Sequence, residues 1–332
     1  MDFTMKTKKL HKIINQQHIK QMALVLTLLL LSSCNYGYEA PLRIGTNQWP
    51  GYEPFYLART LNYYQNSSIK LVELPSASEV IHALRSGNLE VAALTLDEAL
   101  LLISEGLDLK VILVTDFSAG GDVLLSKPGI DSLEKLKGKK IAVEYTAVGA
   151  LLLDSALKAG GLKLTDIQVV GCTLSDHIDC YGSNDAIVTF EPMRTILLDQ
   201  NATLLYDSSQ IPGKIVDVVV TTKEVIDSHP ESLSRLISGF FKAHQYLDKN
   251  PIKAAQFMSK RMQLSPSKVL NTFKLIQLPS IDENRKLLLG SKSPLQRTAE
   301  SLSQFMRDRK LLNREILFHN LTNDQFLPLA DQ

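Results

Sequence analysis

Polar and aromatic side chains gather where strand-like segments of this 332-residue chain end. Asn47, Gln48 and Trp49 directly follow the segment 42–46, and Trp49 is the only tryptophan of the chain. Ligands of open α/β sheets bind beyond the carboxyl ends of the strands. Amides there can hydrogen-bond a small molecule, and an aromatic ring can cover an apolar or cationic one. We therefore predict that these three residues form one wall of a ligand cleft. The alternative for Trp49 is a core position that fixes the loop.

Hydroxyl groups follow the next two strand-like segments. Ser76 comes after residues 69–73, and Thr95 comes after residues 91–94. Each opens a helical segment, so each is a candidate for a helix N-cap, which is the default, or for a ligand contact. A hydroxyl can do both, and we expect both residues at the cleft.

A third group lies where one strand-like series passes into the next. Asp116, Ser118 and Gly121 occur there, between the segments 109–114 and 122–126. Adjacent glycines suit a hinge or a close approach of the backbone to a ligand. The acid Asp116, with Asp122, could bind an amine or a cationic heterocycle. The alternative is a solvated turn in which Asp116 bonds its own backbone.

Two further loops complete the candidate site. Tyr145 and Thr146 lead into the helical segment 149–159, and a helix N-terminus is a natural seat for an anion. No Arg or Lys falls within that loop, which disfavours a strongly charged oxyanion, and Thr146 could equally be an ordinary cap.

Glu191 follows the segment 186–190 and precedes Pro192. It either caps the next helix or faces the cleft, where with Asp116 it would favour a cationic ligand. Arg194 lies close enough in sequence to neutralise it.

The motifs of common enzyme classes are missing from the sequence. It has no Gly-x-Ser-x-Gly elbow, His-Glu-x-x-His helix or phosphate-binding loop. We therefore predict a protein without catalytic activity or cofactor. Cys172 and Cys180 could form a disulfide or remain two buried thiols. A metal site that also uses His177 and Asp179 is not expected, because the spacing differs from that of structural zinc sites.

The N-terminal residues resemble an export signal. Lys6, Lys8, Lys9, Lys12 and Lys20 precede an apolar run at 23–32, which is shorter than the roughly 20 residues of a membrane-spanning helix. The residues 31–34, Leu-Ser-Ser-Cys, resemble a lipobox, and the alternative is an ordinary signal peptide. We predict that residues 1–33 are removed and that Cys34 is lipidated, which anchors the protein to the outer face of a membrane. Asn35 mildly favours an outer membrane where two membranes exist.

The remainder alternates strand-like and helix-like segments with short connections, which indicates sheets flanked by helices. We predict an α/β protein with two lobes, each a mostly parallel sheet, and a helical C-terminal region. Residues 41–116 and 217–320 would form lobe 1, residues 117–216 lobe 2, and residues 321–332 a loose tail. Without residues 1–33 the net charge is about −3, so we expect no nucleic-acid partner.

Three segments resemble the periplasmic solute-binding proteins of the nitrate, taurine and alkanesulfonate type, a group that is also similar to thiamine-precursor proteins. They are Arg43 to Ala58, Asp116 to Leu125 with Leu133 to Val143, and Asp185 to Pro192. The resemblance implies a type II periplasmic-binding-protein fold that binds a small solute between two lobes. It also implies delivery to an ABC permease with a cytoplasmic ATPase, by a protein that we expect to be a monomer.

Two questions stay open from the sequence alone. The same scaffold could serve as a sensor module that regulates a membrane kinase or cyclase. The family's substrates favour nitrate, taurine or sulfonates, whereas the acids of this chain favour an amine or a neutral heterocycle.

Overall fold

The computed structural model describes residues 39–65, 67–144, 147–290, 292–312, 314–316, 318 and 320–329. The predicted signal, Cys34, Tyr145 and Thr146 lie outside these residues. The chain divides into two units, residues 1–40 and 41–332, and every described helix and strand belongs to the second unit. Within the described residues, no helix has the length and apolar character needed to cross a membrane.

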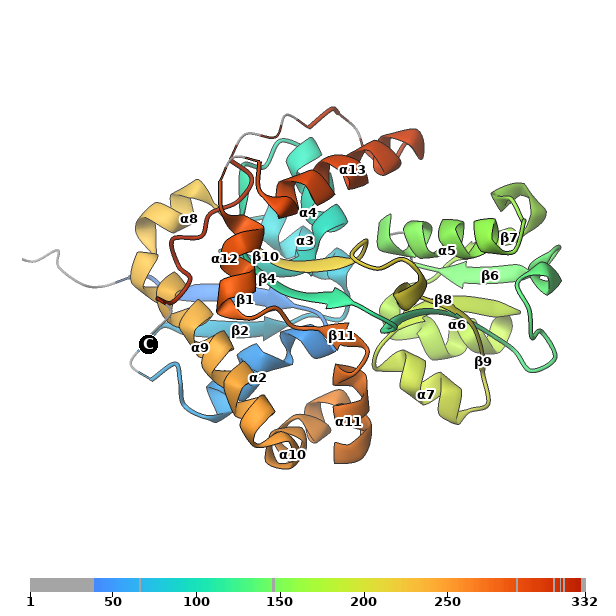
Figure 1. Ribbon diagram of the computed structural model, residues 1–332, viewed down its shortest axis with the longest axis horizontal. Helices are drawn as coiled ribbons and strands as arrows, with labels where there is room; N and C mark the ends of the chain where they lie inside the picture. The colour runs from blue at the N-terminus through green and yellow to red at the C-terminus, as the bar shows by residue number, and fades with distance from the viewer. Residues whose placement is uncertain are drawn as a thin grey trace, which may run out of the picture. The chain divides into compact units, whose positions relative to one another are not determined.

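A six-stranded sheet organises the first half of this unit (Figure 1). Its strands, in the order β11-β4-β10-β3-β1-β2, are β1 (Leu42–Thr46), β2 (Ile69–Glu73), β3 (Val91–Thr95), β4 (Leu109–Ser118), β10 (Val216–Thr222) and β11 (Ile276–Gln277). β1 pairs in parallel with β2 and β3, and β10 is antiparallel to both β3 and β4. We call this sheet and the helices that cover it lobe 1.

A five-stranded sheet organises lobe 2, with its helices. Its strands, in the order β7-β6-β8-β5-β9, are β5 (Asp122–Ser126), β6 (Lys140–Val143), β7 (Gln168–Gly171), β8 (Ala186–Phe190) and β9 (Thr203–Asp207). β6 pairs in parallel with β7 and β8, whereas β5 is antiparallel to β8 and β9. The chain passes between the two sheets after β4 and returns after β9.

The predicted fold class is confirmed, but both sheets are mixed rather than mostly parallel. The antiparallel strands β5 and β10 are the ones that directly follow a passage between the sheets. Each enters its sheet from the end at which the other strands finish, and this direction was not evident from the hydrophobic pattern alone.

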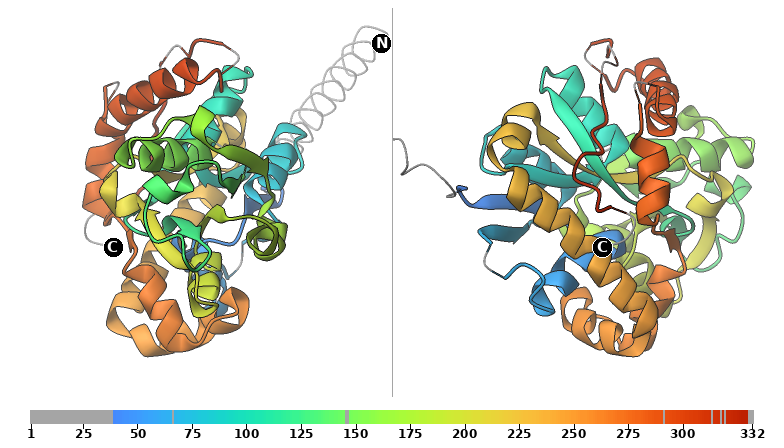
Figure 2. Two further views of the ribbon diagram at one scale, coloured as in Figure 1. Left: turned by 90° about the vertical axis from the view of Figure 1, so that its right-hand side faces the viewer. Right: turned by 60° about the vertical axis from the view of Figure 1, so that its left-hand side comes forward.

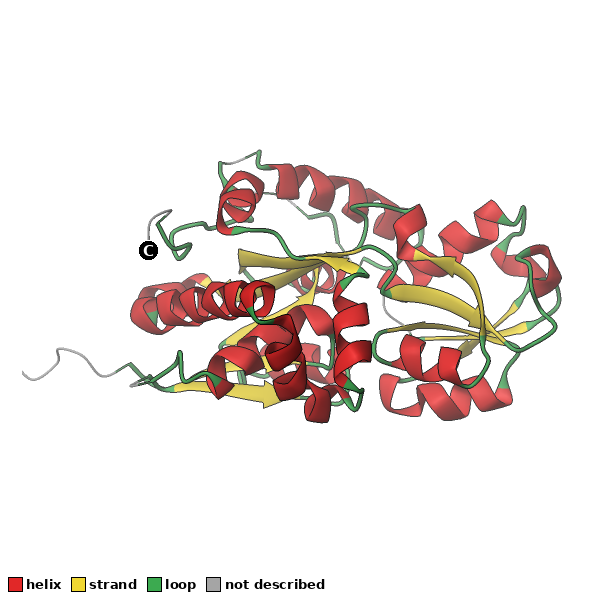
Figure 3. Ribbon diagram, turned by 60° about the horizontal axis from the view of Figure 1, so that its bottom comes forward, coloured by secondary structure: helices red, strands yellow, loops and turns green. Residues whose placement is uncertain are grey.

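Helices flank both sheets (Figure 3). They are η2 (Pro50–Tyr52), α2 (Glu53–Thr60), α3 (Ala77–Arg85), α4 (Leu96–Ser104), η3 (Glu134–Leu136), α5 (Ala147–Ala159), η4 (Leu164–Asp166), η5 (Leu174–Asp176), α6 (His177–Ser183), α7 (Met193–Asp199), η6 (Ser208–Gln210), α8 (Lys223–Ser228), α9 (Pro230–Lys249), α10 (Pro251–Met262), α11 (Pro266–Phe273), α12 (Ile281–Leu288) and α13 (Pro294–Asp308). Pro251, Pro266 and Pro294 each start a helix, because proline lacks the N–H that a first turn leaves unpaired. The C-terminal region is helical as predicted, apart from the short strand β11.

The outer edge of β4 is covered by three different segments. Near its start, the N–H of Val111 donates to the carbonyl of Leu321, and the N–H of Asn323 donates to the carbonyl of Val111. In its middle, the buried side chain of Asn284 bonds both backbone groups of Val114, at 2.8 and 3.0 Å. At its end, β11 pairs with Phe117 and Ser118. Residues 321–328, which we expected to form a loose tail, thus lie against the sheet (Figure 2), and Leu321 is buried.

Asn284 therefore substitutes for a strand at one position of β4. We predict that Asn284→Ala lowers the free energy of unfolding by about 2–3 kcal/mol, because it leaves the buried N–H and C=O of Val114 without partners. Urea unfolding measures the change. The control is Asn88→Ala, an exposed side chain that bonds Ser86, with an expected change within about 0.5 kcal/mol. Equal losses for the two variants would contradict the role given to Asn284.

Candidate ligand-binding site

A cavity lies between the carboxyl edges of the two sheets. Its lining from lobe 1 and the returning chain comprises Asn47, Trp49, Tyr52, Ala77, Thr95, Glu98, Ile215 and Asp217. Its lining from lobe 2 comprises Asp122, Glu144, Val148 and Phe190. Most of these residues follow the ends of the parallel strands β1, β3, β6 and β8, which is where α/β sheets bind ligands. The cavity has room for water-sized molecules over about 40 Å³, and the space around it that no protein atom fills, open solvent included, is about 400 Å³.

Trp49 forms the contact between the lobes at this cavity. Its indole Nε1 donates to both carboxylate oxygens of Asp116, at 3.2 and 3.1 Å. Its ring meets the ring of Phe190 edge-on, with centroids 6.0 Å apart. Aromatic pairs prefer this geometry over a face-to-face sandwich. The ring is 4% exposed, so Trp49 is buried and still lines the cavity.

Two glycines leave the space that Trp49 needs. A Cβ on Gly121 would lie 2.7 Å from Cη2 of Trp49, and one on Gly51 would lie 1.7 Å from Oδ2 of Asp116. Both distances are shorter than any carbon contact that a folded protein tolerates. Gly121 thus lies close to the tryptophan ring, whereas its predicted role as a hinge or a ligand contact stays a prediction.

Four carboxyl groups line the cavity, and each is at least nine-tenths buried: Glu98, Asp122, Glu144 and Asp217. The hydroxyl of Tyr52 donates to Asp217 Oδ1 at 2.5 Å, and the N–H of Thr95 donates to Glu98 Oε2 at 2.9 Å. Asp122 Oδ2 and Glu144 Oε1 are buried without a hydrogen-bond partner among the described residues. The cavity therefore contains acceptor groups that the protein itself leaves unused.

Burial shifts the protonation of these acids. It raises the pKa of Glu98 to about 8, with help from the negative charges of Asp97 and Glu144. It raises the pKa of Asp122 and of Glu144 to about 7, and it raises the pKa of Asp217 well above its usual range. A carboxylate taken out of water without a cation nearby favours its neutral form. Burial therefore favours the protonated form of these groups near neutral pH.

The sequence-predicted residues divide into two groups. Asn47, Trp49 and Thr95 line the cavity, and ligand contact by them stays a prediction. Thr95 also precedes α4, where its N–H bonds Glu98. The cleft wall predicted at the end of β1 thus coincides with the cavity at two of its three residues.

The other described candidates lie outside the cavity lining, and the polar side chains among them bond the protein. Gln48 donates to the carbonyl of Arg261, and Ser76 caps α3 by accepting from Glu79 N. The hydroxyls of Ser118 and Ser208 bond each other at 2.7 Å, where the two passages between the sheets meet.

The two acids predicted at the cleft are also engaged elsewhere. Asp116 accepts the hydrogen bond of the Trp49 indole, and burial raises the pKa of Asp116 to about 7. Glu191 accepts from Thr195 Oγ1 at 2.9 Å and pairs with Arg194 at 3.2 Å, so it caps α7 and is neutralised.

Sequence reasoning did not select Tyr52, Glu98, Glu144, Phe190 and Asp217 as site residues, and it named Asp122 only together with Asp116, as an acid that could bind an amine. Glu144 and Phe190 end or directly follow strands that had been recognised, so the carboxyl-edge rule would have found them. Asp217 lies at the start of β10, whose antiparallel direction gave no such signal. Its bond to Tyr52 joins residues 165 positions apart, which sequence spacing does not reveal.

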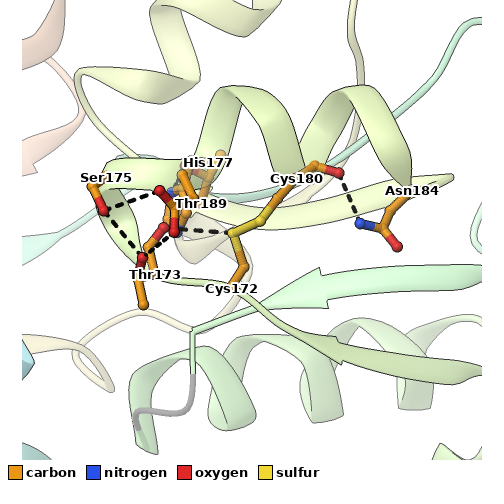
Figure 4. The surroundings of a disulfide bond; sticks show 8 residues. Cys172, Thr173, Ser175, His177, Cys180, Asn184 and Thr189 are labelled. Atoms are coloured by element: carbon orange, nitrogen blue, oxygen red, sulfur yellow. Dashed lines mark hydrogen bonds between the residues drawn. A yellow bond between two sulfur atoms is a disulfide. The ribbon is translucent and has the colours of Figure 1, made fainter.

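Cys172 and Cys180 are joined by a disulfide that links the end of β7 to α6 (Figure 4). Beside it, His177 Nδ1 lies 2.9 Å from Thr189 Oγ1, and its ring meets Phe190 edge-on. Burial lowers the pKa of His177 to about 4, so this histidine adds no positive charge behind the cavity. Across the described residues, no set of three or more His, Cys, Asp or Glu is placed to hold a metal ion.

Comparison with known proteins identifies the family. The model of the NMT1-like family matches residues 37–261, which is more than half of the chain. The chain belongs to the NMT1-like family. The taurine-binding periplasmic protein of Escherichia coli strain K12 is 25% identical over 224 residues, which are 64% of this chain and 70% of that protein. The predicted resemblance is confirmed, and so is the class of function, a periplasmic solute-binding component.

Solved structures share the fold of this NMT1-like protein. The alkanesulfonate-binding protein SsuA from Xanthomonas axonopodis pv. citri, bound to MOPS, has a TM-score of 0.74 at 17% identity. The match covers 87% of this chain and all of that one. The desulfurization enzyme DSZB has a TM-score of 0.62 at 15% identity, with 86% and 97% covered. The fold thus occurs in both binding proteins and an enzyme.

The buried acids predict how the stability of the ligand-free protein depends on pH. Carboxyls whose pKa is raised by folding bind more protons in the folded than in the unfolded state. They therefore stabilise the folded state increasingly as the pH falls from about 8 toward 5, and this contribution is lost as the pH rises. We expect Glu98→Gln to reduce the gain in free energy of unfolding between pH 8 and pH 5 by about 1 kcal/mol or more.

Urea unfolding of the wild type and the variant at both pH values measures this difference. Glutamine keeps the acceptor for the N–H of Thr95, so the capping bond is preserved. Glu224→Gln, an exposed position on α8, is the control and should leave the pH dependence unchanged. The explanation fails if Glu98→Gln retains the full wild-type pH dependence.

Proposed function

We propose that this protein is the extracytoplasmic solute-binding component of an ABC importer. It binds a small solute in the cavity between its lobes and delivers it, unchanged, to a permease with a cytoplasmic ATPase. The observation that carries the proposal is the cavity itself, because both lobes contribute its lining at the carboxyl edges of their sheets. Lipidation at Cys34 would hold a monomer at the outer face of the membrane, with residues 1–33 removed.

Two passages of chain connect the lobes and are suited to a hinge. Gly120 has a φ of +120°, which side-chain-bearing residues rarely adopt, and its N–H donates to Ser208 Oγ at 2.7 Å. Ser208 in turn bonds Ser118, so the outward and returning passages are tied to each other. A rotation at this point would move lobe 2 as one body. The boundaries at residues 116/117 and 216/217 are part of the proposal.

Contacts between the lobes would hold the closed form. Lys268, after the start of α11, pairs with Asp199 at the end of α7, and Arg309, after α13, pairs with Asp154 on α5. Each of these pairs joins lobe 1 to lobe 2. A solute shifts the balance toward closure by its greater affinity for the closed form.

The second candidate function is a sensor module, in which the same closure regulates a membrane kinase or cyclase. Neighbouring genes distinguish the two, because a permease and ATPase pair favours import and a lone sensor kinase favours signalling. The desulfurization enzyme among the structural neighbours makes catalysis a third candidate, which predicts turnover of the solute.

A solute screen tests the proposed function. We expect one class among sulfonates, nitrate, amines, pyrimidines and flavins to raise the melting temperature. A solute at about 100 times its Kd adds about 2.7 kcal/mol to the free energy of unfolding. The same solute should change the fluorescence of Trp49, the chain's only tryptophan, and mass spectrometry should recover it chemically unchanged. A modified solute would overturn the binding-protein proposal in favour of an enzyme.

The ion pairs between the lobes give a second test. We predict that Lys268→Ala combined with Arg309→Ala weakens binding of the best solute by about 3- to 10-fold, because partly exposed ion pairs contribute up to about 1 kcal/mol each. Isothermal titration calorimetry measures the Kd. Lys223→Ala, which removes an exposed pair with Asp227 within α8, is the control and should bind like the wild type. Unchanged affinity in the double variant would exclude these pairs as determinants of closure.

A further inference from the structure

We infer that the cavity selects a small organic cation, such as a protonated amine, whose charged group meets Asp122 and Glu144 and whose apolar part packs against Trp49 and Phe190. This inference rests on the proposed solute-binding function and names the class of solute. An organic cation differs from the ligands in the names of the taurine- and sulfonate-binding relatives, because those ligands carry a sulfonate group.

The charge of the lining disfavours an anion. Glu98, Asp122, Glu144 and Asp217 line the cavity, and no Lys, Arg or His does so among the described residues. The nearby bases have other roles: Arg194 pairs with Glu191, and His177 is held neutral by burial. Tyr145 and Thr146, which follow Glu144 in the chain, are uncharged residue types. A bound anion would therefore meet four acids without a compensating base, and its binding would require all four to stay protonated.

Two of these acids have free acceptors. Asp122 Oδ2 and Glu144 Oε1 are buried and have no hydrogen-bond partner in the described structure, although both residues line the cavity. Buried polar atoms are nearly always paired in native proteins. An ammonium group offers three donors and a positive charge, which is the complement that such buried acceptors lack. Both acids belong to lobe 2, so the cation would bridge them to the aromatic ring supplied by lobe 1.

The start of α5, where an anion would otherwise bind, already faces an acid of the protein. The backbone N–H of Val148, in its first turn, donates to the carboxylate of Asp97 on α4. The positive end of this helix is thus opposite a carboxylate before any solute enters. Asp97 itself is 3% exposed. An anionic solute would have to displace this carboxylate from lobe 1, whereas a cation leaves it in place.

The aromatic lining suits the rest of such a solute. Trp49, Tyr52 and Phe190 face the same cavity. Aromatic faces attract cations and pack well against apolar groups. A metal ion is a poorer candidate, because no group of three or more suitable ligands converges within the described residues.

A bound cation would reverse the protonation of the cavity. It favours the charged form of a carboxyl, so binding releases the protons that burial retains on Glu98, Asp122 and Glu144. The other titratable groups around them are Asp97 on α4, Asp116 on β4, Asp217 on β10, Tyr52 in η2, and the Glu191–Arg194 pair. Each of these acids has a pKa raised by burial, so the whole lining changes in one direction. Cation affinity should therefore fall as the pH is lowered from 8 to 6.

Calorimetric titration with shape-matched pairs tests the inference. The probes are ethanolamine against glycolate, 2-phenylethylamine against 3-phenylpropionate, and taurine and methanesulfonate as sulfonates. We expect at least one amine to bind the purified chain at pH 8 at least tenfold more tightly than its matched anion. Its affinity should fall at least tenfold in Glu144→Gln and in Asp122→Asn, and also in the wild type at pH 6. Glu224→Gln, exposed on α8, should bind like the wild type.

The outcomes separate this inference from the function on which it rests. If a sulfonate or carboxylate binds more tightly than every amine, the cation inference is overturned and the solute-binding function stands. If neither charge binds to a protein that melts cooperatively, both are overturned. Should Glu144→Gln or Asp122→Asn fail to fold, the pH series on the wild type decides alone, since an anionic solute would bind more tightly, not less, at pH 6.

Discussion

The burial of four carboxyl groups around one cavity, without a base among the described lining, is the constraint on which the site depends. Removing a carboxylate from water is costly unless a cation or several hydrogen bonds compensate. Burial accordingly raises the pKa of Glu98 and of Glu144, which favours the protonated form of both acids. Burying these four acids together without a cation therefore disfavours their charged forms. In the proposed function, a solute that supplies the missing positive charge removes this cost, and it favours closure by its greater affinity for the closed form.

Trp49 connects this electrostatic constraint to the movement of the lobes. Its indole is fixed by Asp116 in lobe 1, and its ring contacts Phe190 in lobe 2. Gly121, at the passage between the lobes, packs against the same ring. Trp49, which would cover the solute in the proposed function, is thus in contact with the passage between the lobes, which is the proposed hinge. A change in the angle between the lobes would consequently also change the environment of the Trp49 ring.

The sequence predicted the parts of the site that follow local rules. Strands that end at the same edge of a sheet bring Asn47, Trp49 and Thr95 to one place, and this follows from hydrophobic pattern and parallel pairing. Contacts between distant segments were not predictable in this way. The bond of Ser118 to Ser208 spans 90 residues, and the attachment of residues 321–328 to β4 depends on a strand edge that the hydrophobic pattern does not reveal. The tail was predicted to be loose for that reason.

The fold that this chain shares with its relatives also does not determine the charge of the solute. Helix N-termini and strand-end carboxylates lie at the same edge of such sheets, so one scaffold can be made to favour an anion or a cation. What decides is whether the helix end is free and whether the acids are paired. In this chain Asp97 bonds the first turn of α5, while Asp122 and Glu144 keep unpaired oxygens. The sign of the charge that such a site accepts is thus set by a few side chains rather than by the fold.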